Sequence, residues 1–187
     1  MTLRRGFKDE AERRATDLRA TLGLGPSSVA STEQLAEAAG ITIVDAADLI
    51  DVDRLVELEN IQAFAFSACT FEIRDRRIIV TNPLRSGGRR NSDVAHELSH
   101  VLLEHELAEV RDVGGMFFRT CQPDEEEEAT ALGGTLLLPR KLLLGAASKG
   151  WGTDEVAEQC GVTTEMARYR LNTTGVHRQV AATRSRQ

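Results

Sequence analysis

The chain has 187 residues, of which 41% are hydrophobic, 28% are charged and only 4% are aromatic, and its formal net charge is −6. This length suits one compact domain with a small appendage, and the acidic balance gives the chain as a whole no attraction for nucleic acid. The apolar runs are too short for a membrane span or a usual secretory signal, and the three cysteines form no CxxC pair, so we expect a cytoplasmic protein without membrane contact.

The first third of the chain is expected to be mainly helical. Apolar residues at helical spacing predict a helix over residues 7–22 and a second, capped helix over residues 33–39. The β-branched run 41–44 predicts a short strand. Residues 46–60 again show helical apolar spacing, although several aspartates weaken this pattern.

Two strands and an arginine-rich loop are expected next. Residues 63–73 alternate partly between apolar and polar, a turn follows, and residues 77–81 return, which predicts an antiparallel hairpin. Residues 83–91 are then expected to form a loop that leads into a helix. Three consecutive polar residues are candidates for the cap of that helix: Asn91, Ser92 and Asp93.

The helix after this loop carries the sequence HELSH, an example of HExxH. On an α-helix His96 and His100 lie one turn apart on the same face, so both imidazoles can reach one metal ion. Glu97 lies close enough to take a proton from a water at that ion without being a ligand. The motif therefore predicts a catalytic metal site of which two ligands are histidines.

The remainder of the chain is expected to be helical, except for residues 106–123, to which no element is assigned. Apolar spacing predicts helices over residues 125–138 and 140–147 and a helical pair over residues 153–172. The residues from 173 onward are polar and basic, and we expect them to be a loose tail.

These elements predict an α+β fold, in which a mostly helical, zincin-like domain packs a small antiparallel sheet on the HExxH helix. An edge strand of such a sheet can hold an extended peptide. We expect a metallopeptidase-like domain over residues 1–150, a helix-turn-helix-like pair packed on it over residues 151–175, and a flexible basic tail over residues 176–187.

A third protein ligand is needed for a catalytic zinc site. The pattern HExxHxxGxxH is excluded because Leu103 and Glu106 occupy its glycine and third-histidine positions. On a continuing helix His105 would point away from the two motif histidines, and we interpret it as structural or solvent-exposed. The other source of a ligand is an acidic run at the start of the following helix, and spacing alone does not choose among its members Glu125, Glu126, Glu127 and Glu128.

Two motifs together carry a resemblance to a known family. The HELSH helix is followed by the pattern Glu-x-Glu-Ala, six further residues and Leu-Leu-x-Pro, which occupies residues 126–139. This combination resembles the ImmA/IrrE family of zinc metallo-endopeptidases. Residues 5–8 and 168–175 are similar to an actinobacterial branch of that family, so the likeness extends over most of the chain.

The resemblance implies a zinc ion, Zn²⁺, and a set of site residues. In the family the ligating glutamate lies thirteen residues before the helix-ending proline, which implies His96, His100 and Glu126 as ligands here. It implies Glu97 as the general base. The chain departs from the family where Thr130 replaces an Asn or Asp, a change that weakens a hydrogen bond to a ligand. Mn²⁺ and Fe²⁺ are alternatives at such a site.

The resemblance also implies a protein substrate, typically a helix-turn-helix transcriptional repressor. The candidates for stabilising the oxyanion are Arg119, His105 and Tyr169, among which the sequence does not decide.

The alternative interpretation is a DNA-associated regulatory protein with a non-proteolytic metal site. Residues 153–171 resemble a helix-turn-helix, with Gly161 at the turn. Three arginines in or after this pair could contact phosphates: Arg168, Arg170 and Arg178. Because the second helix offers few side chains that read bases, we expect structural packing rather than DNA contact.

Overall fold

The computed structural model of the protein describes residues 3–63, 66–73, 76–106, 110–113, 116–119 and 122–185. Within these ranges the chain is mostly helical with a small sheet, which confirms the expected α+β class. None of these helices is long and apolar enough to cross a membrane. The helices are α1 (Phe7–Thr21), α2 (Thr32–Ala38), the 3-10 helix η1 (Ala46–Asp48), α3 (Val52–Ile61), α4 (Gly87–Leu102), α5 (Pro123–Leu137), α6 (Arg140–Ser148), α7 (Thr153–Cys160), α8 (Thr164–Thr174) and α9 (Val176–Arg184).

The sheet is mixed rather than antiparallel. Its strand order is β1-β3-β2, in which β2 pairs with β3 antiparallel and β1 pairs with β3 parallel. The chain passes through α3 and β2 between β1 and β3, and this crossover lets β1 and β3 run in the same direction. The predicted hairpin is present, but its first strand begins at Ala68 rather than at Ala63. The strands are β1 (Thr42–Asp45), β2 (Ala68–Ile73), β3 (Arg76–Thr81) and a separate hairpin of β4 (Val110–Val113) and β5 (Met116–Arg119).

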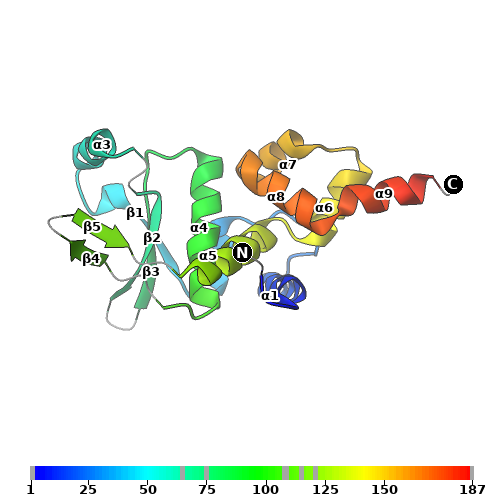
Figure 1. Cartoon of the computed structure of the whole chain (residues 1–187), viewed down its shortest axis with the longest axis horizontal. Helices are drawn as coiled ribbons and strands as arrows, with labels where there is room; N and C mark the ends of the chain where they lie inside the picture. Colours follow the sequence, from blue (N-terminus) through cyan, green and yellow to red (C-terminus); the bar gives the residue numbers. More distant parts are fainter. Residues whose placement is uncertain are drawn as a thin grey trace.

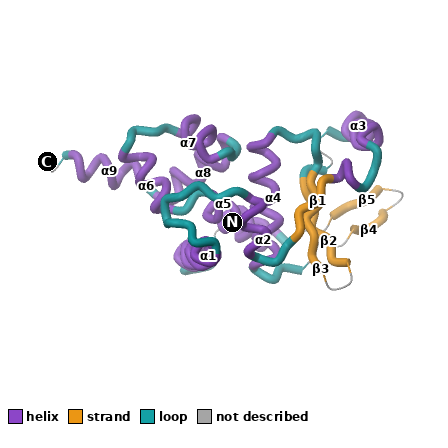
Figure 2. Tube along the Cα trace, turned by 180° about the vertical axis from the view of Figure 1, so that it is seen from behind, coloured by secondary structure: helices purple, strands orange, loops and turns teal. Residues whose placement is uncertain are grey.

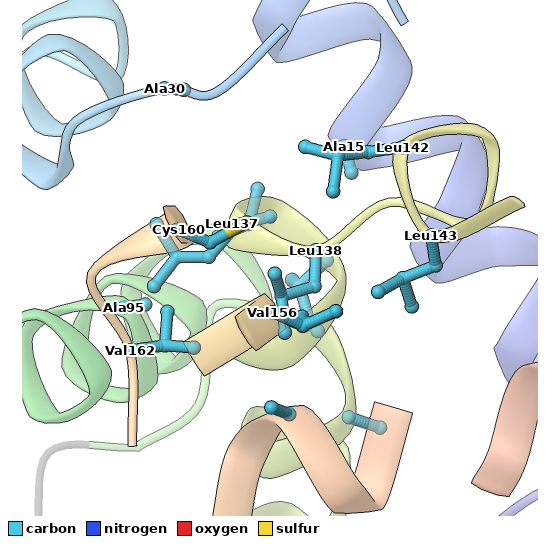
Figure 3. Close-up of a cluster of buried hydrophobic side chains, with 14 of the residues drawn as sticks. Ala15, Ala30, Ala95, Leu137, Leu138, Leu142, Leu143, Val156, Cys160 and Val162 are labelled. Carbon is cyan, nitrogen blue, oxygen red and sulfur yellow. The ribbon is translucent and has the colours of Figure 1, made fainter. Parts of the chain in front are cut away.

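The motif helix α4 lies at the centre of the molecule, between the sheet and the helices α6–α9, whereas α3 lies at the sheet end (Figures 1 and 2). It contacts β2 and β3 on one side and packs most extensively on α5. Its apolar residues Val94, Ala95 and Leu98 are fully buried. They belong to one hydrophobic cluster that continues through α1, α5, α6, α7 and α8, part of which is drawn in Figure 3. The helical pair α7–α8 therefore packs on the core of the rest of the chain.

Helix α4 begins earlier than the sequence indicated. Its cap is Ser86, whose hydroxyl accepts a hydrogen bond from the first turn of the helix. The prediction that one of residues 91–93 caps this helix is wrong, because all three lie inside it. Asn91 instead donates to the backbone carbonyl of Gly161 at 2.8 Å, which joins α4 to the turn between α7 and α8.

The helical pair is held in place by a buried arginine of α8. Arg170 is only 6% exposed, and its guanidinium donates to the carbonyl oxygen of Leu138 and to a carboxylate oxygen of Glu12, at 3.1 and 2.6 Å. The expectation that Arg170 could contact phosphate is therefore wrong, because this side chain satisfies the end of α5 and pairs with α1. Arg168, one half-turn earlier, is exposed.

Replacing this arginine should destabilise the fold. Arg170→Ala removes the guanidinium that donates to the Leu138 carbonyl and pairs with the Glu12 carboxylate, which keeps its hydrogen bond from the Arg140 amide. We expect a loss of about 2–4 kcal/mol in the free energy of unfolding. The matched change Arg168→Ala removes an exposed arginine from the same helix and should cost less than about 0.5 kcal/mol. Urea unfolding of the two variants measures the difference, and equal midpoints would contradict this role of Arg170.

The C-terminal residues differ from the expected flexible tail. Residues 176–184 form α9, which begins directly after the left-handed Gly175 and packs on α6. Val176 is fully buried, and Arg184 donates to the carbonyl oxygen of Ser148 at 2.9 Å. The sequence did not predict this helix because little more than its first turn reaches the core, so its composition is mostly polar.

Candidate metal centre

Helix α4 brings the two motif histidines together. The Nε2 atoms of His96 and His100 lie 3.1 Å apart, with the ring planes inclined by 74°. The two nitrogens thus face one common point, as a shared ion would require.

Helix α5 supplies a carboxylate at the same point. The oxygens of Glu126 lie 3.1 Å from Nε2 of His96 and 3.5 Å from Nε2 of His100. Among the described residues, His96, His100 and Glu126 form the group whose arrangement could hold a metal ion. Ligand atoms at about 2.0–2.1 Å from a tetrahedral zinc would be separated by about 3.3 Å. The three separations of 3.1, 3.1 and 3.5 Å bracket this value.

The close packing of α5 on α4 sets the position of Glu126. A Cβ atom on Gly133 would lie 2.8 Å from the backbone oxygen of Ala95 and 3.0 Å from the backbone nitrogen of His96. Only glycine lets the two backbones approach this closely. The acidic run that begins α5 is thereby brought over the histidines of α4, which explains why a residue distant in sequence completes the group.

Burial keeps one of the histidines in the state that binds metal. Burial, followed by the neighbouring His96, lowers the pKa of His100 to about 4. The ring is therefore neutral near pH 7, and a neutral imidazole nitrogen is the form that binds a metal ion.

Glu97 is buried beside this group. It is 3% exposed, and one of its carboxylate oxygens accepts a hydrogen bond of 2.7 Å from the hydroxyl of Thr70 on β2. Its charge also acts on His100. A buried carboxylate that accepts from a hydroxyl and acts on His100 is a group that could take up a proton at this position. Sequence reasoning did not identify Thr70, because the pairing depends on how β2 packs on α4.

His105 does not lie where the sequence indicated. It was expected to point away from the motif histidines, but its Nδ1 lies 3.0 Å from Nδ1 of His100 and the residue is buried. Helix α4 ends at Leu102, and Glu104 has a positive φ of 58°, which turns the chain back under the helix. The structural interpretation of His105 holds, whereas the direction expected from a continuing helix is wrong.

An open cavity of about 820 Å³ adjoins the group on the side of α5 and α8. Glu126 and Thr130 line it from α5, Tyr169 and Thr173 from α8, and residues 3–6 from the N-terminal segment. Thr130 also approaches Nδ1 of His96, at 3.5 Å, which is the limit of a hydrogen bond. Of the three residues of the group, Glu126 lines this cavity, and His96 lines a second, smaller cavity that also has Thr130 in its wall.

The three oxyanion candidates are placed differently. Tyr169 lines the cavity together with Glu126. His105 lies behind His100 and is 9% exposed, which makes it a poor candidate for contact with a substrate. Arg119 belongs to β5, but its side chain lies outside the described part of the chain. Of the two candidates whose side chains are described, Tyr169 is the one that the geometry favours.

Comparison with known proteins identifies the family. Residues 36–172 match the sequence profile of a peptidase family described as the IrrE N-terminal-like domain. The chain belongs to this family. The match spans the sheet, the motif helix, α5 and the α7–α8 pair, and it confirms the resemblance to the ImmA/IrrE family. The similarity of residues 5–8 and 168–175 to an actinobacterial branch stays a prediction. Membership supports a metallopeptidase-type function and implies a metal ion, which the grouping of His96, His100 and Glu126 could hold.

A solved structure shares the fold. A Mycobacterium tuberculosis transcriptional regulator superposes with a TM-score of 0.53 at 19% sequence identity, over 90% of this chain and 47% of that one. The chain thus spans about half the length of that protein. No curated protein sequence matches the chain.

Proposed function

We propose that this protein is a zinc-dependent, cytoplasmic metallo-endopeptidase, with His96, His100 and Glu126 as the zinc ligands and Glu97 as the general base. The observation that carries the proposal is the close grouping of the ligand atoms. The two Nε2 atoms lie 3.1 Å apart, and the two oxygens of Glu126 lie 3.1 Å from Nε2 of His96 and 3.5 Å from Nε2 of His100, separations that suit a tetrahedral zinc. Two imidazoles and one carboxylate form a donor set found in catalytic zinc sites, which keep one position for water. A purely structural site would have no need of Glu97.

Each of these residues would have a separate role in peptide hydrolysis. When bound, zinc supplies Lewis acidity that polarises the scissile carbonyl and lowers the pKa of a water. Glu97 takes a proton from this water at a carboxylate oxygen and delivers it to the leaving amine. The Thr70 hydroxyl occupies one oxygen of Glu97 and thereby orients the other. Tyr169, at the wall of the cavity, is the side chain we propose to donate to the oxyanion.

The substrate we propose is an extended segment of a partner protein, such as a helix-turn-helix repressor. Strand β2 is an edge strand of its sheet, and its residue Thr70 touches the general base. A peptide added along this edge would pass beside Glu97 with its backbone held by hydrogen bonds. This arrangement favours cleavage within a chain rather than at its end.

The proposal is tested with a mixture of peptides prepared from a bacterial proteome. The purified protein, loaded with zinc, should cut internal peptide bonds, and removal of zinc by a chelator should abolish the cuts until zinc is restored. Mass spectrometry of the products locates them. A zinc-loaded protein that cuts no peptide or folded repressor under these conditions would contradict the proposal.

Removing the hydroxyl that holds the general base should slow the reaction. Thr70→Val keeps the shape of the side chain but leaves the buried Glu97 carboxylate without this donor, so we expect turnover to fall about tenfold. The amount of bound zinc should not change, because Thr70 contacts none of the three proposed ligands. Steady-state kinetics on a cleaved peptide, with zinc content measured in parallel, checks this. Unchanged turnover would show that Glu97 does not depend on this hydrogen bond.

The second candidate remains a DNA-associated regulator. In its favour, α7 and α8 form a helix-turn-helix-like pair around a left-handed Gly161, and Arg168 of α8 is exposed. Against it, Arg170 is buried in the core. A gel-shift titration separates the two functions: salt-sensitive binding of duplex DNA that Arg168→Ala weakens would support the regulator.

A further inference from the structure

A second layer of side chains lies behind the metal centre. Nδ1 of His105 is 3.0 Å from Nδ1 of His100, on the side of the ring opposite the nitrogen that faces His96 and Glu126. On its own far side, Nε2 of His105 lies 3.6 Å from a carboxylate oxygen of Glu128. The other oxygen of Glu128 accepts a hydrogen bond of 2.7 Å from Arg4. The chain of contacts thus runs from the metal position to the N-terminal segment.

The binding of a metal ion by His100 would determine which nitrogen donates and which accepts in each of these contacts. A neutral imidazole that binds metal through Nε2 keeps its proton on Nδ1. His100 is then the donor and Nδ1 of His105 is the acceptor. An acceptor at Nδ1 requires that the proton of a neutral His105 lie on Nε2, where it faces the carboxylate of Glu128. The tautomers of both rings follow from one assumption, that His100 binds metal through Nε2.

The backbone is shaped to place His105 at this point. Its amide donates to the carbonyl of His100 at 3.0 Å, and the turn that allows this holds Glu104 at a φ of 58°. A left-handed conformation is unfavourable for a residue with a side chain. On a continued helix, position 105 would lie on another face of α4, so the observed contact depends on this turn.

We propose that His105 is a positioning residue, which fixes the orientation and the tautomer of His100 for metal binding and is itself oriented by Glu128. Metal-bound histidines commonly donate their second nitrogen to a carboxylate or a carbonyl; here a second histidine stands between the ligand and the carboxylate. The inference rests on the proposed function in that His100 must be a metal ligand.

Two variants of nearly equal shape test the role of the acceptor. His105→Asn retains an oxygen that can occupy the place of Nδ1, whereas His105→Leu fills similar space without an acceptor. We expect the dissociation constant for zinc, measured by competition with a chelating indicator, to rise 10–100-fold in His105→Leu and less than about threefold in His105→Asn. The melting temperatures of the two metal-free variants control for packing. Equal affinity of both variants, whether retained or lost, would overturn the proposal.

A measurement on the unaltered protein does not depend on how the variants fold. Nitrogen-15 NMR of the histidine rings in the zinc-loaded protein distinguishes the two tautomers. We expect a proton on Nδ1 of His100 and on Nε2 of His105, and a His105 ring that carries its proton on Nδ1, or on both nitrogens, would overturn the proposal. Failure of the unaltered protein to bind zinc at all would instead overturn the proposed function, and this inference with it.

Discussion

Replacing Glu97 by glutamine is expected to reduce peptide cleavage about 1,000-fold while leaving zinc bound. General-base catalysis contributes about 10²–10⁴-fold to a rate, and a glutamine amide cannot take a proton from water. Glutamine has the shape of glutamate and retains an oxygen that can accept from Thr70, so the packing between α4 and β2 should persist. The loss should therefore appear in turnover, with little change in the Michaelis constant.

Steady-state kinetics of Glu97→Gln against the unaltered protein provides the measurement, with bound zinc and thermal melting as controls. A turnover within tenfold of the unaltered protein would show that another group accepts the proton. Loss of zinc together with activity would show that Glu97 is needed to hold the ion, and our assignment of roles within the motif would be wrong.

The second large effect is expected at Gly133, where α5 meets α4. The Cβ atom of an alanine would lie 2.8 Å from the carbonyl oxygen of Ala95, and neither backbone can yield without moving its helix. We expect Gly133→Ala to lower the free energy of unfolding by about 1–3 kcal/mol. Because the same contact holds Glu126 over His96, zinc affinity should fall as well.

The control for this change is a glycine in open space. Gly145 lies in α6 and is exposed, and apart from its chain neighbours and the adjacent backbone of its own helix no atom lies within 4 Å of the place that the methyl group of an alanine would occupy. Gly145→Ala should raise stability by about 0.5–1 kcal/mol, because alanine is the better helix former. Urea unfolding and zinc titration of both variants give the comparison. Equal stability of the two would contradict the close approach of α4 and α5.

Most of the helical fold could be predicted from the sequence because apolar spacing records which face of each helix is buried. The helices around Leu35, Leu98 and Leu136 were predicted on this basis, and these residues are fully buried. The start of α4 was missed because Gly87-Gly88 is typical of a loop. A Cβ atom on Gly88 would lie 2.9 Å from the carbonyl oxygen of Val162, so this glycine serves a tertiary contact instead.

In the candidate site, too, the features that depend on local spacing could be predicted from the sequence, and those that depend on tertiary packing could not. The pairing of His96 with His100 follows from helical periodicity, which is local. Glu126 was chosen among four glutamates by the resemblance. The spacing of residues within α5 does not show which of them faces α4, because that depends on how the two helices pack. The direction of the His105 side chain was predicted wrongly because the turn before it is made by Glu104 in a left-handed conformation, and no glycine marks this turn in the sequence. Thr70 and its contact with Glu97 depend on a sheet–helix contact that leaves no pattern in the sequence.

The zinc content of the protein and its variants decides whether His96, His100 and Glu126 hold a zinc ion. Elemental analysis should find about one zinc per chain in the protein purified without chelator, and almost none in His100→Ala and Glu126→Ala. Glu125→Ala, altered at the neighbouring position of α5, should retain the ion. A folded protein that binds no zinc when zinc is supplied, or a Glu126→Ala variant that still holds a full equivalent, would contradict the account.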